Sequence, residues 1–243
     1  IVFGDWSSDV CSSDLEGTSE YAKIEIESDK PVVIGLSGDW HLDGNIDKDM
    51  LRLDLDIMAN HPLVVGSFLL GDLLDAANFN PAQDESILNF EEQRQALMSI
   101  LDSIGKKRIL GMWKGNHDHK WERKHGTSKY AGLSERYECP IFYGDSYLDL
   151  DINGINYKLL GSHRKRGSSV YTNAHPSVAG HRQVQGVDIV FCGHTHRRGY
   201  VEQPVREFRG SRMTYSIVSG TYQHDSEYTK DSGFGTQQGA ELG

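Results

Sequence analysis

The sequence predicts an α/β fold in which two packed mixed β-sheets are flanked by helices. Three observations lead to this class. Apolar runs at residues 32–36, 63–70 and 108–113 have the composition of short strands, and the second run is continuous enough to be covered on both faces. Residues 47–61 and 85–104 carry apolar side chains at helical spacing between those strands. Strand signals dominate the second half, so a strand meander is expected to pack beside the alternating first half.

The first half can be assigned element by element. Residues 21–27 alternate between polar and apolar side chains as a strand does, and Pro31 separates them from the next strand. The first helix is expected to begin near Asp47 and the second to end at Gly105, because these residue types cap helix starts and ends. A basic helical stretch and then residues 128–137 follow the third apolar run.

The second half is expected to consist mainly of strands. Residues 147–152 and 155–160 are joined by Asn153-Gly154, and this dipeptide is a strong signal for a two-residue hairpin turn. The other elements expected here are a helix near residues 178–184 and strands at residues 188–192 and 213–219.

The chain has 243 residues, which is enough for one large α/β domain with a full core, and we assign residues 16–243 to it. Residues 4–15 show neither helical nor strand periodicity, and they resemble the translation of a sequencing-library adapter. Residues 1–15 are therefore expected to be an artefactual or disordered segment outside the fold. This interpretation leaves the true start outside the chain and allows the polar C-terminal run to be cut short as well.

Composition excludes some classes of protein. No apolar run approaches the length of a membrane span and nothing resembles a secretory signal, so a cytoplasmic location without a membrane partner is expected. The three cysteines lie far apart, which argues against a disulfide framework and against a cysteine zinc site. The net charge of −10 argues against broad nonspecific binding of nucleic acid, although it leaves room for a local basic rim.

Polar segments that contain glycine follow directly after five of the expected strands. Glycine lets the backbone double back, and strand ends in layered α/β folds converge on one crevice. The candidate ligands are two carboxylates, one amide oxygen and four imidazoles, which is enough for two metal ions. Such ligands suit Mn²⁺, Fe or Zn²⁺ and argue against Ca²⁺ or a thiolate site. The segments are Asp39-x-His41, Gly71-Asp72, Gly115-Asn116-His117-Asp118, Gly161-Ser162-His163 and Gly193-His194-Thr195-His196.

No single segment is decisive. Two loop histidines bonded to the backbone explain the His-x-His pair as readily as a metal does. The ordered set of five segments is specific, and it resembles the calcineurin-like metallophosphoesterase family, whose pattern runs D-x-H, G-D-x-x-D, G-N-H-D/E, a lone strand-end H and G-H-x-H. The segments cover residues 39–196, nearly two thirds of the chain. The resemblance implies a four-layer αββα sandwich. The first segment departs from the commonest form, D-x-H-G or D-x-H-L-G, which leaves the subfamily open.

The resemblance also implies a ligand set and a pair of divalent cations, with Mn²⁺ expected first and Fe or Zn²⁺ as alternatives. Two other histidines, His175 and His181, compete with His163 as a ligand, but only His163 follows an apolar strand directly. The implied ligands of one metal are Asp39, His41, Asp72 and His196, with Asp72 bridging to a second metal that is completed by Asn116, His163 and His194.

The reaction implied is hydrolysis of a phosphate mono- or diester by in-line attack of a hydroxide that bridges the metals. By the same resemblance, His117 faces the leaving group and stabilises the transition state or donates a proton. Asp75 matches the second aspartate of G-D-x-x-D and orients His117, unless it is a plain loop carboxylate. Asp118 is expected to tie down its own turn rather than to take part in the chemistry.

The expected partner is an anionic phosphoester, with a nucleotide or nucleic acid included. A nuclease of the same superfamily is an alternative function, and a non-catalytic scaffold is a third, although no ligand is lost here. Basic residues flank the segments and form either a rim that steers anionic substrate or a solvated surface. Aromatic residues nearby are candidates for stacking on a base, although core packing explains Trp113 equally well. The basic residues are Lys114, Lys120, Arg123, Lys124, Arg164, Lys165, Arg166, Arg197 and Arg198, and the aromatic ones are Trp113, Trp121, Tyr171 and Tyr222.

Overall fold

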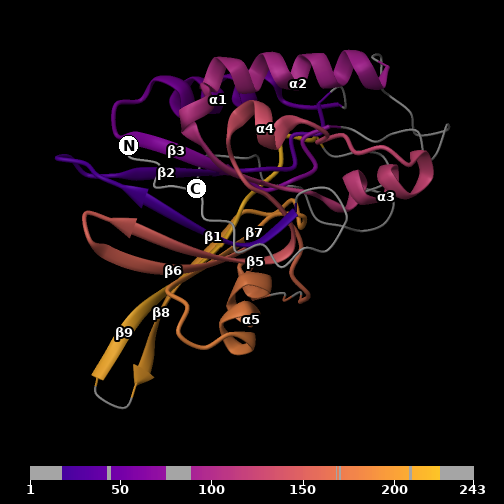
Figure 1. Cartoon of the computed structure of the whole chain (residues 1–243). Helices are drawn as coiled ribbons and strands as arrows, with labels where there is room; N and C mark the ends of the chain where they lie inside the picture. Colours follow the sequence, from indigo (N-terminus) through magenta and orange to yellow (C-terminus); the bar gives the residue numbers. More distant parts are fainter. Residues whose placement is uncertain are drawn as a thin grey trace.

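A computed structural model gives the architecture of most of the chain (Figure 1). It has the mixed α/β class that the sequence predicts, with a curled mixed sheet and helices packed against it. The segment at residues 1–15 lies outside the described residues. The structure describes residues 18–42, 45–74, 89–167, 169, 171–207 and 210–224.

Hydrogen bonds join the strands into one sheet of order β2-β3-β4-β5-β6-β7-β9-β8, and β1 pairs with β5 off this path. The β5–β6 and β8–β9 pairs are antiparallel, and all other pairs are parallel. The strands are β1 Thr18–Ile26, β2 Val33–Ser37, β3 Val64–Leu69, β4 Ile109–Trp113, β5 Ile141–Ile152, β6 Ile155–Ser162, β7 Ile189–Cys192, β8 Gly199–Glu207 and β9 Gly210–Val218.

Strand β5 joins two halves of the sheet that the sequence predicts as two separate sheets. Its first residues, Ile141 and Phe142, pair with β4, whereas its later part pairs with β6. Gly144, with φ of 73°, lies between these two parts. The sequence predicted only the later part of β5, so the hydrogen-bonded link between the halves was missed. The four-layer arrangement as such stays a prediction.

The core between the two halves is aromatic. Trp113 stacks on Phe142 with ring centroids 4.4 Å apart, and it meets Phe191 edge-on at 5.4 Å. Phe68 stacks on Phe191 at 5.5 Å. All four rings are fully buried. Because these residues come from β3, β4, β5 and β7, their burial stabilises the contact between the two halves of the curled sheet.

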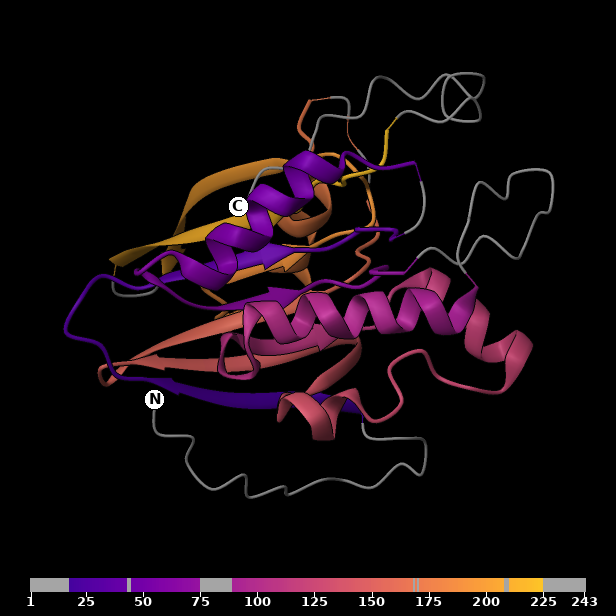
Figure 2. The ribbon, with the colours of Figure 1, turned by 90° about the horizontal axis from the view of Figure 1, so that it is seen from above.

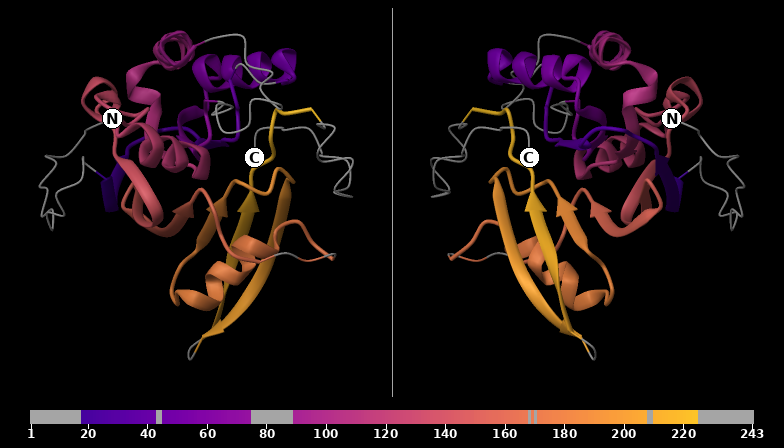
Figure 3. Two further views of the ribbon diagram at one scale, coloured as in Figure 1. Left: turned by 90° about the vertical axis from the view of Figure 1, so that its right-hand side faces the viewer. Right: turned by 90° about the vertical axis from the view of Figure 1, so that its left-hand side faces the viewer.

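Helices cover the outer faces. Helices α1 and α2 lie together over the β2–β4 half, as Figure 2 shows, and bury Met58, Leu97 and Leu101 against it. Helix α5 lies on the other half (Figure 3). No helix in the described ranges is long and apolar enough to cross a membrane. The helices are α1 Lys48–Asn60, α2 Phe90–Ile104, α3 Asn116–His125, α4 Leu133–Tyr137 and α5 His175–Gln183, with a 3₁₀ turn η3 at Lys106–Arg108.

Local sequence signals explain most element ends. Asp47 caps α1 as predicted, because its carboxylate accepts a hydrogen bond of 2.9 Å from the backbone N–H of Met50. Helix α2 ends at Gly105 as predicted, but it begins at Phe90 rather than at residue 85. The start was placed too early because the capping box of Asn89 and Glu92 was not recognised.

The hairpin turn between β5 and β6 is confirmed. Asn153 and Gly154 have φ of 53° and 82°, and a two-residue hairpin turn with a positive φ at both positions requires such residues. Strand β8, in contrast, was not predicted. It is an edge strand that contains Pro204 and exposes Tyr200, so it lacks the apolar run that marks a covered strand.

Candidate metal centre

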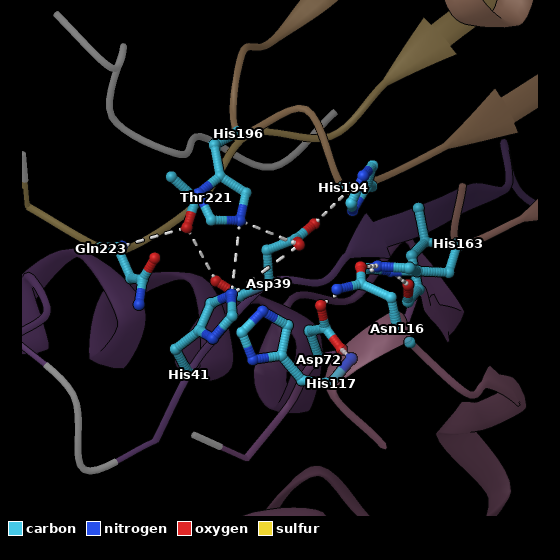
Figure 4. Close-up of polar contacts among 12 residues, drawn as sticks. Asp39, His41, Asp72, Asn116, His117, His163, His194, His196, Thr221 and Gln223 are labelled. Atoms are coloured by element: carbon cyan, nitrogen blue, oxygen red, sulfur yellow. Dashed lines mark hydrogen bonds and ion pairs between the residues drawn. The ribbon is translucent and has the colours of Figure 1, made fainter. Parts of the chain in front are cut away.

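The five predicted segments meet at one place (Figure 4). They follow β2, β3, β4, β6 and β7, and their polar side chains point toward one another from both halves of the sheet. The sequence argument about converging strand ends is therefore confirmed at the level of placement. The residues brought together are Asp39, His41, Asp72, Asn116, His117, His163, His194 and His196.

The first ligand group consists of Asp39, His41 and His196, whose ligand atoms all lie within 4.8 Å of one another. The Nε2 atoms of the two imidazoles are 3.3 Å apart. The carboxylate Oδ1 of Asp39 lies 3.3 Å from Nε2 of His196 and 3.9 Å from Nε2 of His41. Asp39 and His41 are almost completely buried, whereas His196 is partly exposed, so the group is open to solvent on one side only through His196.

The second ligand group consists of Asp72, His163 and His194, again with ligand atoms within 4.8 Å. Nε2 of His163 lies 3.2 Å from Oδ2 of Asp72 and 3.0 Å from Oδ1 of Asn116. Nδ1 of the same ring lies 2.6 Å from the backbone oxygen of Leu70. This outer contact fixes the ring so that Nε2 faces the group, which is the usual arrangement of a ligating histidine.

The geometry of these groups fits two divalent cations. Nε2 of His163 faces two oxygen acceptors, which only a proton or a cation can satisfy together. Oδ2 of Asp39 accepts a hydrogen bond of 2.8 Å from the N–H of His194, whereas its buried Oδ1 accepts none within the described residues. Burying a charged carboxylate oxygen costs free energy unless a hydrogen bond or a cation compensates for the lost hydration. The oxygen and imidazole donors suit Mn²⁺, Fe or Zn²⁺.

The carboxylates are ionised in this environment. Burial by itself raises the pKa of Asp39, but the close contact with His196 and the charge of His163 outweigh burial, so the pKa lies below the usual value. Burial acts in the same direction on Asp72, but the charge and hydrogen bond of His163 hold its pKa below the usual range. Both side chains therefore offer negative charge to a cation at neutral pH.

The pKa values of the imidazoles differ from one another. Burial and repulsion from His196 lower the pKa of His41 to about 3, and burial with the charge of His163 lowers the pKa of His194 to about 4. Burial also disfavours protonation of His163, but the carboxylate of Asp72 outweighs it and raises the pKa to about 9. Two rings are thus neutral and ready to bind a cation, whereas His163 carries a proton that a cation must displace.

The backbone is strained at the ligands. Outside glycine, a positive φ costs roughly 1–2 kcal/mol, so it persists only where surrounding contacts enforce it. Hydrogen bonds of 2.9 and 3.0 Å, from the N–H groups of Asp39 and His41 to the backbone oxygens of Gly71 and Asp72, tie two strand ends together. The ligands with positive φ are Asp39 at 51°, His41 at 47°, Asp72 at 49°, His194 at 71° and His196 at 57°.

Glycines provide the close approach that the sequence predicts. A Cβ atom on Gly115 would lie 1.9 Å from Oδ1 of Asp72, and one on Gly193 would lie 2.6 Å from Oδ2 of Asp39. Both distances are shorter than any real contact, so no other residue fits without moving a ligand. The glycines of G-N-H-D and G-H-T-H are therefore part of the site geometry.

His117 lies beside the ligand groups without belonging to either. Its ring centroid is 5.1 Å from that of His41, and its backbone N–H donates a hydrogen bond of 3.0 Å to Oδ1 of Asp72. Its buried Nδ1 has no hydrogen-bond partner among the described residues. The ring is thus placed at the site, next to the first ligand group. Asp75, the residue expected to orient it, lies outside the described residues.

Two supports of the site were missed by the sequence argument. Thr221, in the segment after β9, donates a hydrogen bond of 2.9 Å to the backbone oxygen of Asp39 and holds the first turn in place. The sequence signal for Thr221 was the end of a sixth strand, G-T-Y. This segment contains glycine, as the other five do, but no candidate metal ligand. The second support is Asp118, which does tie down its own turn, as predicted, but also accepts a hydrogen bond from the N–H of Asp72.

The residues expected at a substrate rim differ in their burial and in their ion pairs. Lys114 and Lys165 are buried and form ion pairs of 2.9 Å with Glu122 and 2.6 Å with Asp145, so their charges are balanced within the protein. Of the aromatic candidates, Trp113, Trp121 and Tyr222 are buried and pack in the fold, whereas Tyr171 is 94% exposed. Core packing was the expected alternative for Trp113. Among the arginines, Arg123, Arg164 and Arg166 are exposed.

Comparisons with known proteins give little information about the function of this chain. No protein-family model matches the sequence, and no curated protein matches it. Among solved structures, the chain is similar to the nuclease MPE of Pseudomonas putida, with 16% identity over 78% of this chain and 73% of that one and a TM-score of 0.34. It is also similar to a metallophosphoesterase from Sphaerobacter thermophilus, with 14% identity over 80% and 78% and a TM-score of 0.39. Likenesses this weak carry no argument, so the function must be inferred from the residues of this chain.

Proposed function

We propose that this chain is a phosphoesterase that depends on two divalent cations and hydrolyses a phosphate mono- or diester. The observation that carries the proposal is the pairing of two buried ligand groups, each with a carboxylate and two imidazoles whose ligand atoms lie within 4.8 Å of one another. The order of the five segments in the sequence agrees with this reading. A site of this kind binds phosphate oxygens well, because two adjacent cations neutralise their charge.

The proposed division of the ligands follows the geometry. Asp39, His41 and His196 would hold one cation, while Asp72 and Asn116 would join two histidines in holding the other. Asp72 is proposed to bridge, as the resemblance of its segment Gly71-Asp72 to the G-D-x-x-D block of metallophosphoesterases implies. When bound, the cations would lower the pKa of water enough to provide a nucleophile near neutral pH. We expect Mn²⁺ first, with Fe or Zn²⁺ as alternatives.

His117 is the proposed catalytic residue. Its ring lies next to the first ligand group, and its buried Nδ1 has no partner within the described part of the chain. From there it would bind the leaving oxygen of the substrate and hold or donate a proton. Asp75 is proposed, from the G-D-x-x-D pattern alone, to orient this ring.

The proposed substrate is an anionic phosphoester. The exposed Arg164 directly follows the ligand His163 in the chain, and Arg166 is exposed two residues later, so both would attract negative charge toward the site. The assay below therefore compares small phosphoesters with DNA.

The test is a metal-dependent hydrolysis assay. Metal-stripped protein is incubated with Mn²⁺ and either bis-(p-nitrophenyl) phosphate, p-nitrophenyl phosphate or single- and double-stranded DNA. Turnover of one of the p-nitrophenyl esters that disappears with a chelator and returns with Mn²⁺ supports the proposal. Faster and salt-dependent cleavage of DNA would favour a nuclease. If folded, Mn²⁺-loaded protein turns over none of these substrates, the remaining reading is a non-catalytic scaffold.

A further inference from the structure

A buried polar network lies behind the second ligand group. Its centre is Asp118, the third residue of α3, whose side chain has no exposure to solvent. Oδ2 of Asp118 accepts hydrogen bonds of 2.8 Å from the N–H of Gly115, 3.1 Å from the hydroxyl of Tyr130 and 3.3 Å from the N–H of Asp72. A carboxylate buried with three donors on one oxygen is held in a single orientation.

Lys129 completes the network. Its side chain is fully buried, and Nζ lies 3.8 Å from Oδ1 of Asp118 and 5.3 Å from the centroid of the Trp121 ring. A fully buried lysine is rare because the charge loses its hydration, so it needs a nearby anion or ring face. Lys129 thereby balances the negative charge of Asp118 at a buried position where water does not solvate that charge.

The network joins two segments that carry ligands. Gly115 precedes α3, whose first residue is Asn116, and Asp72 follows β3. The side chain of Asp118 accepts from the backbone of Asp72, while the side chain of Asp72 accepts a hydrogen bond of 3.0 Å from the N–H of His117. Each of these two segments therefore holds the other in place through a hydrogen bond to the carboxylate of an aspartate. This reciprocal arrangement sets both the orientation of the Asp72 carboxylate and the position of Asn116 beside it.

We propose that Asp118, Lys129 and Tyr130 form a positioning network for the second ligand group. Its effect on metal affinity is selective, because the first ligand group is held differently. Asp39 is fixed by hydrogen bonds from the N–H of His194 and the hydroxyl of Thr221, and neither contact involves the network. Loss of the network should therefore weaken the second cation site more than the first, which shares only the bridging Asp72 with it. The inference rests on the proposed function, because it assumes that the ligand groups bind metal.

The variants that test this are Tyr130→Phe and Asp118→Asn, with Tyr137→Phe as the matched control. Tyr130 and Tyr137 are both almost completely buried, and each donates its hydroxyl to an aspartate, but Tyr137 bonds to Asp102 at 2.9 Å, outside the network. Metal-stripped full-length protein is titrated with Mn²⁺ by calorimetry. A His163→Ala titration identifies which binding step belongs to the second group.

In both network variants, the affinity of the second step should fall about 10- to 100-fold, the usual effect of outer contacts on metal affinity. The affinity of the first step should fall less than that of the second, and the control variant should match the unmodified chain in both steps. Equal weakening of both steps, or no change in either step, would overturn the network proposal. Thermal unfolding of the metal-free variants is measured in parallel, and if Asp118→Asn does not fold, Tyr130→Phe decides alone.

The two proposals fail in distinguishable ways. If the unmodified, folded chain binds no Mn²⁺, the metal centre itself is wrong, and the network proposal is overturned with it. If the unmodified chain binds two Mn²⁺ ions and both network variants do the same with unchanged affinities, only the positioning role is wrong.

Discussion

At the scale of single residues, Gly115 is the position where the second ligand group leaves no room for a side chain. Replacing it with alanine would put Cβ 1.9 Å from Oδ1 of Asp72, so the carboxylate or α3 must move. We expect Gly115→Ala to lose Mn²⁺ binding at the second group, as measured by calorimetry. Gly132→Ala is the control, because Gly132 has φ of 73° but no atom within 4 Å of the added Cβ. That variant should lose about 1 kcal/mol of unfolding free energy from its left-handed backbone and keep its metal affinity.

His117 tests the chemistry separately from metal binding. Its ring contacts neither ligand group through a coordinating atom in the proposed arrangement, so His117→Ala should keep both Mn²⁺ ions. Turnover of the p-nitrophenyl ester should fall by about 10²- to 10⁴-fold, the usual contribution of a general acid or base. His125→Ala, at the exposed end of the same helix, should retain full turnover. Loss of metal from His117→Ala would show that the ring is a ligand instead.

His163 makes metal binding dependent on pH. Its pKa is raised to about 9 in the metal-free fold, above the ordinary value of 6.5. The raised pKa stabilises the metal-free fold fully below pH 6.5, and this stabilisation is lost as the pH rises through about 9. Over the same window the affinity for Mn²⁺ should increase, because less work is needed to displace the proton.

The measurement is calorimetric titration at pH 7.5 in two buffers of different ionisation enthalpy, which reports the protons released on binding. A release close to one proton per chain is expected, and His163→Asn should abolish it. An unchanged proton count in that variant would contradict the assignment.

At the scale of elements, the sequence predicted the strand ends better than the strand pairing. Apolar runs followed by glycine and a candidate ligand identify β2, β3, β4, β6 and β7, because each of these strands is buried where it ends at the site. The predicted N-cap and the hairpin turn are local effects, and both are confirmed. Strand β8 and the first part of β5 were missed, because an edge strand and a strand that changes partners carry no such local signal.

The cap of α1 provides a test at this scale. Asp47→Ala removes the hydrogen bond to the N–H of Met50 and should lower the free energy of unfolding by about 1 kcal/mol. Asp49→Ala, in the first turn of the same helix, removes a charge without removing the cap, and it should cost only about 0.3 kcal/mol. Urea unfolding of both variants checks the difference. Equal costs would mean that the charge rather than the hydrogen bond stabilises the helix.

At the scale of the whole molecule, each ligand group combines side chains from both halves of the curled sheet. In the first group, Asp39 and His41 follow β2 and His196 follows β7, whereas in the second group Asp72 follows β3 and its histidines follow β6 and β7. The seven proposed ligands and their order were predictable from the sequence. The division of each ligand group between the two halves was not, because it depends on how β5 joins them.

Metal binding should therefore stabilise the molecule as a whole. A ligand that binds only the folded state adds about 2.7 kcal/mol to the unfolding free energy at a concentration 100 times its dissociation constant. We expect a chelator to lower Tm, and Mn²⁺ to restore it in a concentration-dependent manner, as measured by circular dichroism. The control is the double variant His163→Ala/His196→Ala, which removes one ligand from each group and should respond to neither reagent. If the chelator lowers Tm equally in this variant, the stabilising ion binds elsewhere, and the two halves are held together by their aromatic core alone.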